Sequence, residues 1–218
     1  MTEIEKNRPL PSQTKLHYDE CYAKFVLEYC YPERYGTLSV LDKPDLQNRC
    51  LDIGVEVTTS ASENFKAAES VACKLPYLSK DQSEKMREKL ENLHVEWHPP
   101  VLIHSPEPVY FGRTIEMVET KFEKLNSGNY QQFSTNDLFV CVNLFLVDAK
   151  TRQELLDTFV SMCNKKCNFS FIFIYAIDTL YASDVCNKQV KCFELQQQNY
   201  DFARKARKMV EDAETNQL

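Results

Sequence analysis

The sequence predicts an α/β protein in which a mixed central sheet is flanked by helices. Three observations favour this class. Two segments, Leu138–Val147 and Phe169–Ala176, are apolar on both faces, as expected for strands in the middle of a sheet. A helical segment from Thr151 to Cys163 joins them, as in a parallel crossover. Upstream, Ile53–Thr58 alternates apolar and polar residues with the period of a strand.

The N-terminal part of the chain begins with a helix, continues with three short strands and returns to a helix. The predicted segments are a helix over His17–Tyr31, strands over Thr37–Leu41, Pro44–Gln47 and Ile53–Thr58, and a helix over Ser62–Leu75. Pro32 ends the first helix, and Ser62 is suited to cap the second.

The amino-acid composition of the chain changes after Leu75. Residues 76–112 contain a very polar helix followed by a stretch with four prolines, Pro99, Pro100, Pro106 and Pro108, which indicates an insertion or a lid. A helix is predicted over Thr114–Leu125, and TRQE at Thr151 is a capping box for the crossover helix. A last helix is predicted over about 188–211. We expect one α/β domain that spans residues 1–218 and carries this insertion.

Size and composition limit the class of protein. The chain has 218 residues, of which 43% are hydrophobic and 27% charged, enough to bury a core. Neither a run of about 18 apolar residues nor the apolar core of a signal peptide is present, so we expect a soluble, cytoplasmic protein with no membrane partner. Nine cysteines, an odd number without a CxxC pair, indicate free thiols rather than a disulfide framework.

Glycine is scarce, and this excludes several kinds of site. The chain has four glycines, which cannot form a GxGxxG turn or a glycine-rich phosphate loop ending in GKS or GKT. A GxSxG serine elbow is also absent. Dinucleotide-binding folds, P-loop enzymes and serine hydrolases of these types are therefore excluded.

Two acidic residues are candidates for a metal site. Side chains alternate along a strand, so Glu56 and Thr58 point to the same face of Ile53–Thr58. If Pro44–Gln47 pairs antiparallel with this strand, Asp45 lies close to Glu56. Two adjacent carboxylates repel each other unless a cation lies between them, and carboxylate oxygens are the ligands that Mg²⁺ prefers. The alternative is a turn-forming aspartate and a solvated strand glutamate.

These residues resemble those of a known family. Pro44-Asp45 followed by Glu56-Val57-Thr58, within an α-β-β-β-α-β order, is similar to the PD-(D/E)xK phosphodiesterase superfamily. The resemblance covers about 18–176 and implies a restriction-endonuclease-like core. It also implies that Asp45 and Glu56 bind Mg²⁺ or Mn²⁺.

The chain departs from the family at one position. In the family, a lysine two residues after the glutamate orients the attacking water and stabilises the developing charge. Thr58 stands there instead, and its hydroxyl can position a water but brings no positive charge. The resemblance leaves Lys43 and Lys66 as candidates for that charge, and Glu28 of the first helix as an additional acidic metal ligand.

The segment from Lys188 to Lys208 has a local excess of cations interleaved with aromatic residues. Its basic residues are Lys188, Lys191, Arg204, Lys205, Arg207 and Lys208. The pattern is typical of a helix that follows a phosphate backbone, and equally of a solvated helix whose cations favour the helix dipole. Because the chain carries a net charge of −6, contact with DNA or RNA is expected to be local.

Two functions are consistent with these residues. The first is a Mg²⁺-dependent or Mn²⁺-dependent phosphodiesterase, a nuclease, acting on nucleic acid. The second is a catalytically inactive nuclease-like fold that serves as a nucleic-acid or protein binding module. The missing lysine and the acidic balance favour the second, while the order of elements and the paired acids favour the first.

Overall fold

The computed structural model describes residues 9–11, 13–93, 95–98, 101–104, 111–127, 133–142, 148–163, 168–176 and 178–215. The chain forms two compact units. The insertion unit comprises Met1–Gln13 and Ala61–Tyr110, and the sheet unit comprises Thr14–Ser60 and Phe111–Leu218. The segment at about 76–112 that we predicted as an insertion falls almost entirely within the insertion unit.

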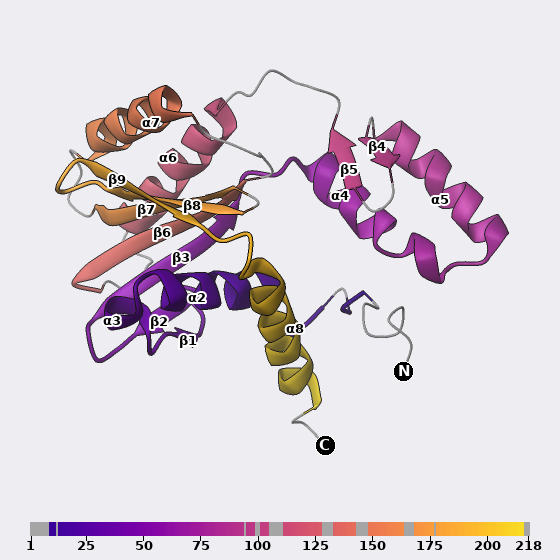
Figure 1. The fold of residues 1–218 in the computed structure, drawn as a ribbon, viewed down its shortest axis with the longest axis horizontal. Coiled ribbons are helices and arrows are strands. Elements are labelled where there is room, and N and C mark those ends of the chain that lie inside the picture. The colour runs from indigo at the N-terminus through magenta and orange to yellow at the C-terminus, as the bar shows by residue number, and fades with distance from the viewer. Residues whose placement is uncertain are drawn as a thin grey trace. The chain divides into compact units, whose positions relative to one another are not determined.

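The sheet unit combines helices with the strands of a single sheet (Figure 1). Its helices are α2 (Tyr18–Cys30), α3 (Pro32–Tyr35), α6 (Gly112–Asn126), α7 (Ala149–Met162) and α8 (Asn199–Thr215). Its strands are β1 (Ser39–Val40), β2 (Leu46–Asn48), β3 (Ile53–Thr59), β6 (Thr135–Val142), β7 (Phe169–Ala176), β8 (Thr179–Asp184) and β9 (Gln189–Glu194). None of the helices in the described ranges is both long and apolar enough to cross a membrane.

The strands form one seven-stranded mixed sheet in the order β1-β2-β3-β6-β7-β8-β9. The central strands β3, β6 and β7 pair in parallel. The outer strands pair antiparallel, β1 and β2 beside β3, and β8 and β9 beside β7. The predicted α/β class with a mixed sheet flanked by helices is thus confirmed, as is the parallel connection from β6 through α7 to β7.

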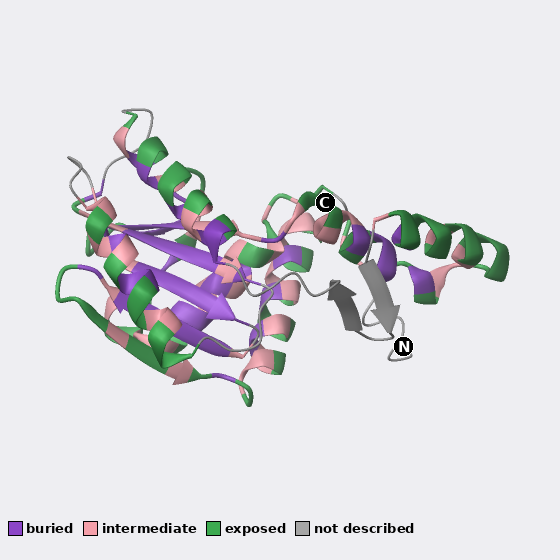
Figure 2. Cartoon of the chain, turned by 90° about the horizontal axis from the view of Figure 1, so that it is seen from above, coloured by how far each residue is buried: buried purple, intermediate pink, exposed green. Residues whose placement is uncertain are grey.

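Helices cover both faces of this sheet (Figure 1). Leu138, Val140, Ile172 and Ile174 pack with residues of α6 and α7 on one face. Alternate residues of the same strands, including Phe139 and Phe173, pack with α2 and α3 on the other. Helix α8 lies beside α2, where the Phe202 and Tyr22 rings are 6.2 Å apart. The central strands are therefore buried on both sides, while the outer sides of the helices are exposed (Figure 2).

A buried carboxylate ties α3 to the sheet. Asp137 of β6 is 0% exposed. It accepts hydrogen bonds from the Tyr35 hydroxyl at 2.7 Å, from the Arg34 guanidinium at 3.0 Å and from the backbone N–H of Phe171 at 2.9 Å. A buried charge is tolerated when it is paired and hydrogen-bonded in this way, and removing one partner is costly.

The insertion unit has a small core of its own. Its described elements are α4 (Glu63–Ala72), the 3₁₀ turn η1 (Leu75–Tyr77), α5 (Lys80–Asn92), β4 (Val95–His98) and β5 (Val101–His104). Buried Ala68, Val71, Leu75 and Leu90 pack together between α4, η1 and α5. The predicted cap is confirmed, since Ser62 Oγ accepts from Phe65 N at 3.0 Å. The β4–β5 hairpin was not predicted.

The C-terminal region differs from the prediction. The helix expected over about 188–211 begins only at Asn199, because Gln189–Glu194 form the edge strand β9. The crossover helix begins earlier than expected. Its N-cap is Asp148, whose Oδ1 accepts from Thr151 N at 2.7 Å, rather than Thr151 in a capping box. Residues 143–147 of the strand predicted over Leu138–Val147 lie outside the described residues.

Candidate active site

Strand pairing brings the two predicted acids together. Strands β2 and β3 are antiparallel, with Leu46 opposite Val55. The next pair in this register is Asp45 and Glu56. The Asp45 carboxylate accepts a hydrogen bond from Val57 N, through Oδ2, at 2.7 Å, which holds it against β3. Asp45 and Glu56 are therefore neighbours across the β2–β3 pair, as the alternation along the strand predicted.

A compact turn fixes the position of Asp45. The side-chain amide of Gln47 donates to the carbonyl oxygens of Pro44 at 3.1 Å and Asp42 at 3.3 Å. The turn also packs tightly on Gly54 of β3, because a Cβ there would lie 2.5 Å from Pro44 Cγ. Glycine at this position is thus required for the close approach of the turn to the strand.

Helix α6 supplies a cation to the site. Its residues Val118, Phe122 and Leu125 are buried against the sheet, and Lys121 lies at the edge of this stripe. The Lys121 ammonium forms an ion pair and hydrogen bond with Glu56 Oε1. Only 12% of the Lys121 side chain and 11% of the Glu56 side chain are exposed. The sequence analysis did not identify Lys121, although its position at the edge of an apolar stripe was a usable signal.

Helix α2 supplies a third acid. Glu20 is three residues from Ala23 and seven from Leu27, two fully buried residues that face the sheet. The pKa of Glu20 is raised from 4.5 to about 7. Burial of the carboxyl is the largest cause, and the negative charges of Asp45 and Glu56 add to it. Glu20 is therefore within electrostatic reach of both strand acids.

Glu28, the acid of this helix predicted as a metal ligand, lies elsewhere on α2. Glu28 forms an ion pair with Lys24, one turn away along α2. It lies eight residues from Glu20, about 12 Å along the helix axis at 1.5 Å per residue. The acid of α2 that faces Asp45 and Glu56 is thus Glu20.

Burial dominates the electrostatics of the two strand acids. It raises the pKa of Glu56, and the Asp45 carboxylate raises it further, while Lys121 acts in the opposite direction. Burial also raises the pKa of Asp45, against the hydrogen bond from Val57 N and the charge of Lys121. The site concentrates negative charge in a poorly solvated place, which favours the binding of a cation.

The remaining catalytic candidates from the sequence are Thr58, Lys43 and Lys66. Thr58 is half-buried on the same strand face as Glu56. Lys43 is exposed and lies 3.8 Å from Asp42. Lys66 belongs to the insertion unit, where its ammonium pairs with Glu63 at 2.9 Å.

The predicted nucleic-acid-binding residues do not share one helix. Lys188 and Lys191 belong to the β8–β9 hairpin, and the others belong to α8. The cations of α8 pair with acids of the same helix: Arg204 and Lys205 with Asp201, Arg207 with Glu211, and Lys208 with Asp212, each at 2.7 Å. Such i,i+3 and i,i+4 pairs are typical of a solvated helix surface.

A metal ion at Asp45 and Glu56 would have few protein ligands. Among the residues that the structure describes, no group of three or more His, Cys, Asp or Glu side chains is arranged to hold a metal. Mg²⁺ nevertheless usually binds one or two carboxylates and completes its shell with water and substrate phosphate. Two adjacent carboxylates with raised pKa values fit that requirement.

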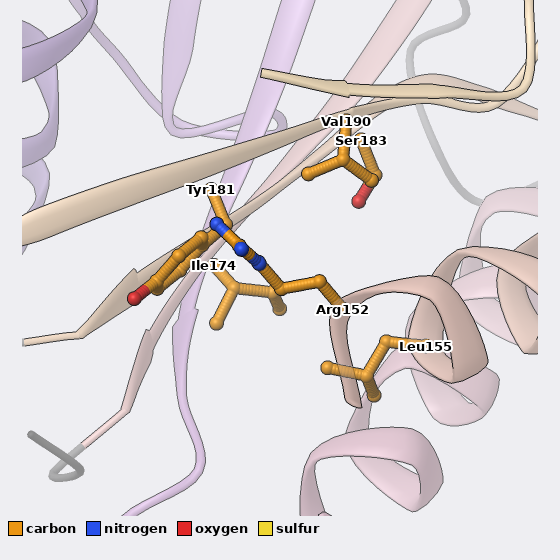
Figure 3. Close-up of a pocket in the computed structure, with 6 residues that line it drawn as sticks. All are labelled: Arg152, Leu155, Ile174, Tyr181, Ser183 and Val190. Carbon is orange, nitrogen blue, oxygen red and sulfur yellow. The ribbon is translucent and has the colours of Figure 1, made fainter. Parts of the chain in front are cut away.

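Two cavities lie elsewhere in the sheet unit. Figure 3 shows the smaller, about 10 Å³, lined by Arg152, Leu155, Ile174, Tyr181, Ser183 and Val190. This volume holds about one water molecule. Arg152 closes it, with its guanidinium 5.5 Å from the Tyr181 ring and donating to Cys192 Sγ at 2.7 Å. An open groove of about 460 Å³ runs between α2 and α8, and Lys205 and Lys208 line it. Neither cavity gathers acidic residues.

Comparison with known proteins does not assign the chain to a family. No protein-family model matches it, and neither curated proteins nor solved structures give a match. The function must therefore be inferred from the fold and the site.

Proposed function

We propose that this protein is a metal-dependent phosphodiesterase that cleaves nucleic acid, with a restriction-endonuclease-like core. The observation that carries the proposal is the meeting of Asp45 and Glu56 across β2 and β3, with Lys121 against Glu56. Within the sheet unit, α2 and α3 precede β1, β2 and β3, and α6 precedes the parallel strand β6, an order that supports that core.

The reaction is hydrolysis of a phosphodiester. Water adds to phosphorus, one P–O ester bond breaks, and the products are a phosphate monoester and an alcohol. Asp45 and Glu56 would hold Mg²⁺ or Mn²⁺, which when bound promotes ionisation of water and neutralises charge on the phosphate. The Thr58 hydroxyl, on the same strand face as Glu56, is suited to position the attacking water by hydrogen bonding.

Lys121 supplies the positive charge that Thr58 cannot. Its ammonium approaches the site from α6 rather than from β3. If Glu56 held the metal ion, the Lys121 ammonium beside it would face the substrate phosphate, where a fixed positive charge stabilises the transition state. Glu20, the third acid near Asp45 and Glu56, is placed to accept the proton of the attacking water.

Cleavage assays with point variants test this proposal. The purified chain is incubated with labelled single-stranded DNA, duplex DNA and RNA in Mg²⁺, in Mn²⁺ and in EDTA. We expect metal-dependent cleavage that Asp45→Asn, Glu56→Gln and Lys121→Met each reduce by at least a hundredfold, because each removes a metal ligand or the transition-state charge. Each variant must first show native circular dichroism.

Glu28→Gln is the matched control for these substitutions. It removes an acid from α2 but leaves the acids that face the site, so cleavage should continue at the wild-type rate. Equal cleavage by wild type, Asp45→Asn and Glu56→Gln would contradict the proposal. So would loss of activity in Glu28→Gln alone.

One observation favours a second function, that of a catalytically inactive binding module. Lys121 already neutralises Glu56, so the site holds a protein cation where an enzyme would hold a metal ion. Under this alternative, Mg²⁺ and Mn²⁺ leave the melting temperature unchanged, because a ligand that binds only the folded state must raise it. A rise that is absent in Asp45→Asn would favour the enzyme.

A further inference from the structure

Three half-buried aromatic residues lie together where the C-terminal end of α2 meets β7 and β9. They are Tyr31, Phe171 and Phe193, and we call them the aromatic surface. The Tyr31 ring centroid is 5.1 Å from that of Phe193 and 5.9 Å from that of Phe171. Each ring packs against the core with one part and keeps another part accessible.

An exposed lysine lies over this surface. The Lys191 ammonium is 4.5 Å from the Phe193 ring centroid and 5.6 Å from that of Tyr31. Lys191 belongs to β9, the last strand of the sheet. The neighbouring acid Asp184 accepts hydrogen bonds from Asn187 at 2.9 and 2.8 Å in the hairpin turn. An exposed cation on a long flexible stem can leave a ring face and contact a phosphate.

A second cation is fixed in place. The Arg34 guanidinium carbon is 5.0 Å from the Phe171 ring centroid, and the same group donates to buried Asp137 at 3.0 Å. Because Asp137 holds it, Arg34 cannot move as Lys191 can. The aromatic surface thus combines half-buried rings with one mobile and one fixed positive charge.

We propose that the aromatic surface binds single-stranded nucleic acid, with unpaired bases stacked on its rings and Lys191 on the phosphate backbone. Aromatic rings interleaved with cations are the usual means of holding single strands without sequence preference. A duplex keeps its bases stacked inside and offers them no access to these rings. The proposal rests on the proposed nuclease function and specifies its substrate as a single strand.

Helix α2 links this surface to the candidate active site. Tyr31 follows the helix directly, and Glu20 lies near its beginning. Eleven residues separate them, about 16 Å along the helix axis at 1.5 Å per residue. A single strand of a few nucleotides spans a distance of this size.

Binding measurements without metal test the proposal separately from catalysis. Fluorescence anisotropy is recorded with a labelled oligothymidylate of about a dozen nucleotides, within the site size of such surfaces, in EDTA at several salt concentrations. A duplex of the same length serves as the competitor. The test variants are Phe193→Leu, which keeps an apolar side chain, and Lys191→Gln. Their matched controls are Tyr200→Leu, which replaces a ring that is 81% exposed, and Lys150→Gln on α7, whose side chain is 85% exposed.

We expect the single strand to bind more tightly than the duplex. Phe193→Leu should weaken binding roughly fivefold or more, the effect of losing one base–aromatic stack. Lys191→Gln should reduce the slope of log affinity against log salt by about 0.7, the value for one phosphate contact on a single strand. Both control variants should bind like wild type.

Preference for the duplex, or equal binding by Phe193→Leu, Lys191→Gln and wild type, would overturn the proposal. These outcomes are distinguishable from failure of the nuclease function. Cleavage that depends on Asp45 while both test variants bind normally rejects only the aromatic surface. Single-strand binding that depends on Phe193 and Lys191, without cleavage in Mg²⁺ or Mn²⁺, rejects only the enzyme.

Discussion

Replacing Lys121 by methionine tests the electrostatics of the site most simply. The substitution keeps an unbranched apolar side chain at the edge of the buried stripe of α6 but removes the ammonium from Glu56. The Glu56 carboxylate then remains nearly buried beside Asp45 without its cation. We expect a substantial loss of stability that depends on pH.

The size of the loss follows from the burial of the pair. Breaking a buried ion pair by removing one partner costs about 3–5 kcal/mol. The two side chains keep 11% and 12% of their surface exposed, so we expect a loss near the lower end, about 3 kcal/mol. Protonation of Glu56 sets an upper limit. At pH 8, which is roughly 3.5 units above the ordinary pKa of 4.5, protonating the Glu56 carboxylate costs about 5 kcal/mol, and the loss of stability cannot exceed this cost.

The same reasoning fixes the direction of the pH dependence. In Lys121→Met the pKa of Glu56 in the folded protein rises further above 4.5, so the folded state is favoured at low pH and this advantage is lost as pH rises. The deficit relative to wild type should therefore shrink toward pH 5.5, where the cost of protonation is only about 1.4 kcal/mol. It should be largest at pH 8.

Thermal unfolding followed by circular dichroism at pH 5.5 and pH 8 measures both effects. A loss of about 3 kcal/mol lowers the melting temperature of a protein of this size by about 6–12 °C. Lys124→Met removes an exposed cation one turn further along α6 and should cost under about 1 kcal/mol. Combining Lys121→Met with Glu56→Gln should restore most of the loss at pH 8. If Lys121→Met and Lys124→Met lost the same amount of stability at both pH values, the reasoning would be refuted.

Three further predictions address Glu20, Gly54 and Asp137. NMR titration of the Glu20 carboxyl should give a pKa of about 7, and this pKa should fall in Asp45→Asn. Because the pKa of Glu20 is raised in the folded state, the stability it contributes is complete below pH 4.5 and is lost as pH rises through 7. The stability of Glu20→Gln should therefore fall less than that of wild type over this pH range. Gly54→Ala should cost about 1–3 kcal/mol in urea unfolding and abolish metal binding, because the new Cβ displaces Pro44. Asp137→Asn should cost about 3 kcal/mol by the same measurement but leave binding of Mn²⁺ unchanged.

The pairing of the two acids could be predicted because it depends on local pattern. Strict alternation in Ile53–Thr58 and a short turn before it define the β2–β3 pair, and the register then places Asp45 beside Glu56. The buried strands β6 and β7 were equally clear, since their apolar runs are continuous. These features require little knowledge of distant parts of the chain.

The third acid and the cation depend on tertiary packing, and the sequence did not reveal them. Glu20 and Glu28 both lie on α2, and only the packing of Ala23 and Leu27 against the sheet decides which one faces Asp45. Lys121 is 65 residues from Glu56 in sequence, so its approach depends on how α6 crosses the sheet.

The β8–β9 hairpin was missed for a related reason. Strand β9 is the last in the sheet, and most of its side chains are exposed and polar. Its composition is close to that of a solvated helix, and only its pairing with β8 makes it a strand. Lys188 and Lys191 were consequently predicted to lie on the same helix as Arg204.

Diffraction from crystals soaked in Mn²⁺ tests the central claim most directly. The account predicts an anomalous peak about 2 Å from one oxygen of Asp45 and one of Glu56, with the Lys121 ammonium withdrawn from Glu56. The absence of a peak there, with Lys121 still paired to Glu56, would contradict it.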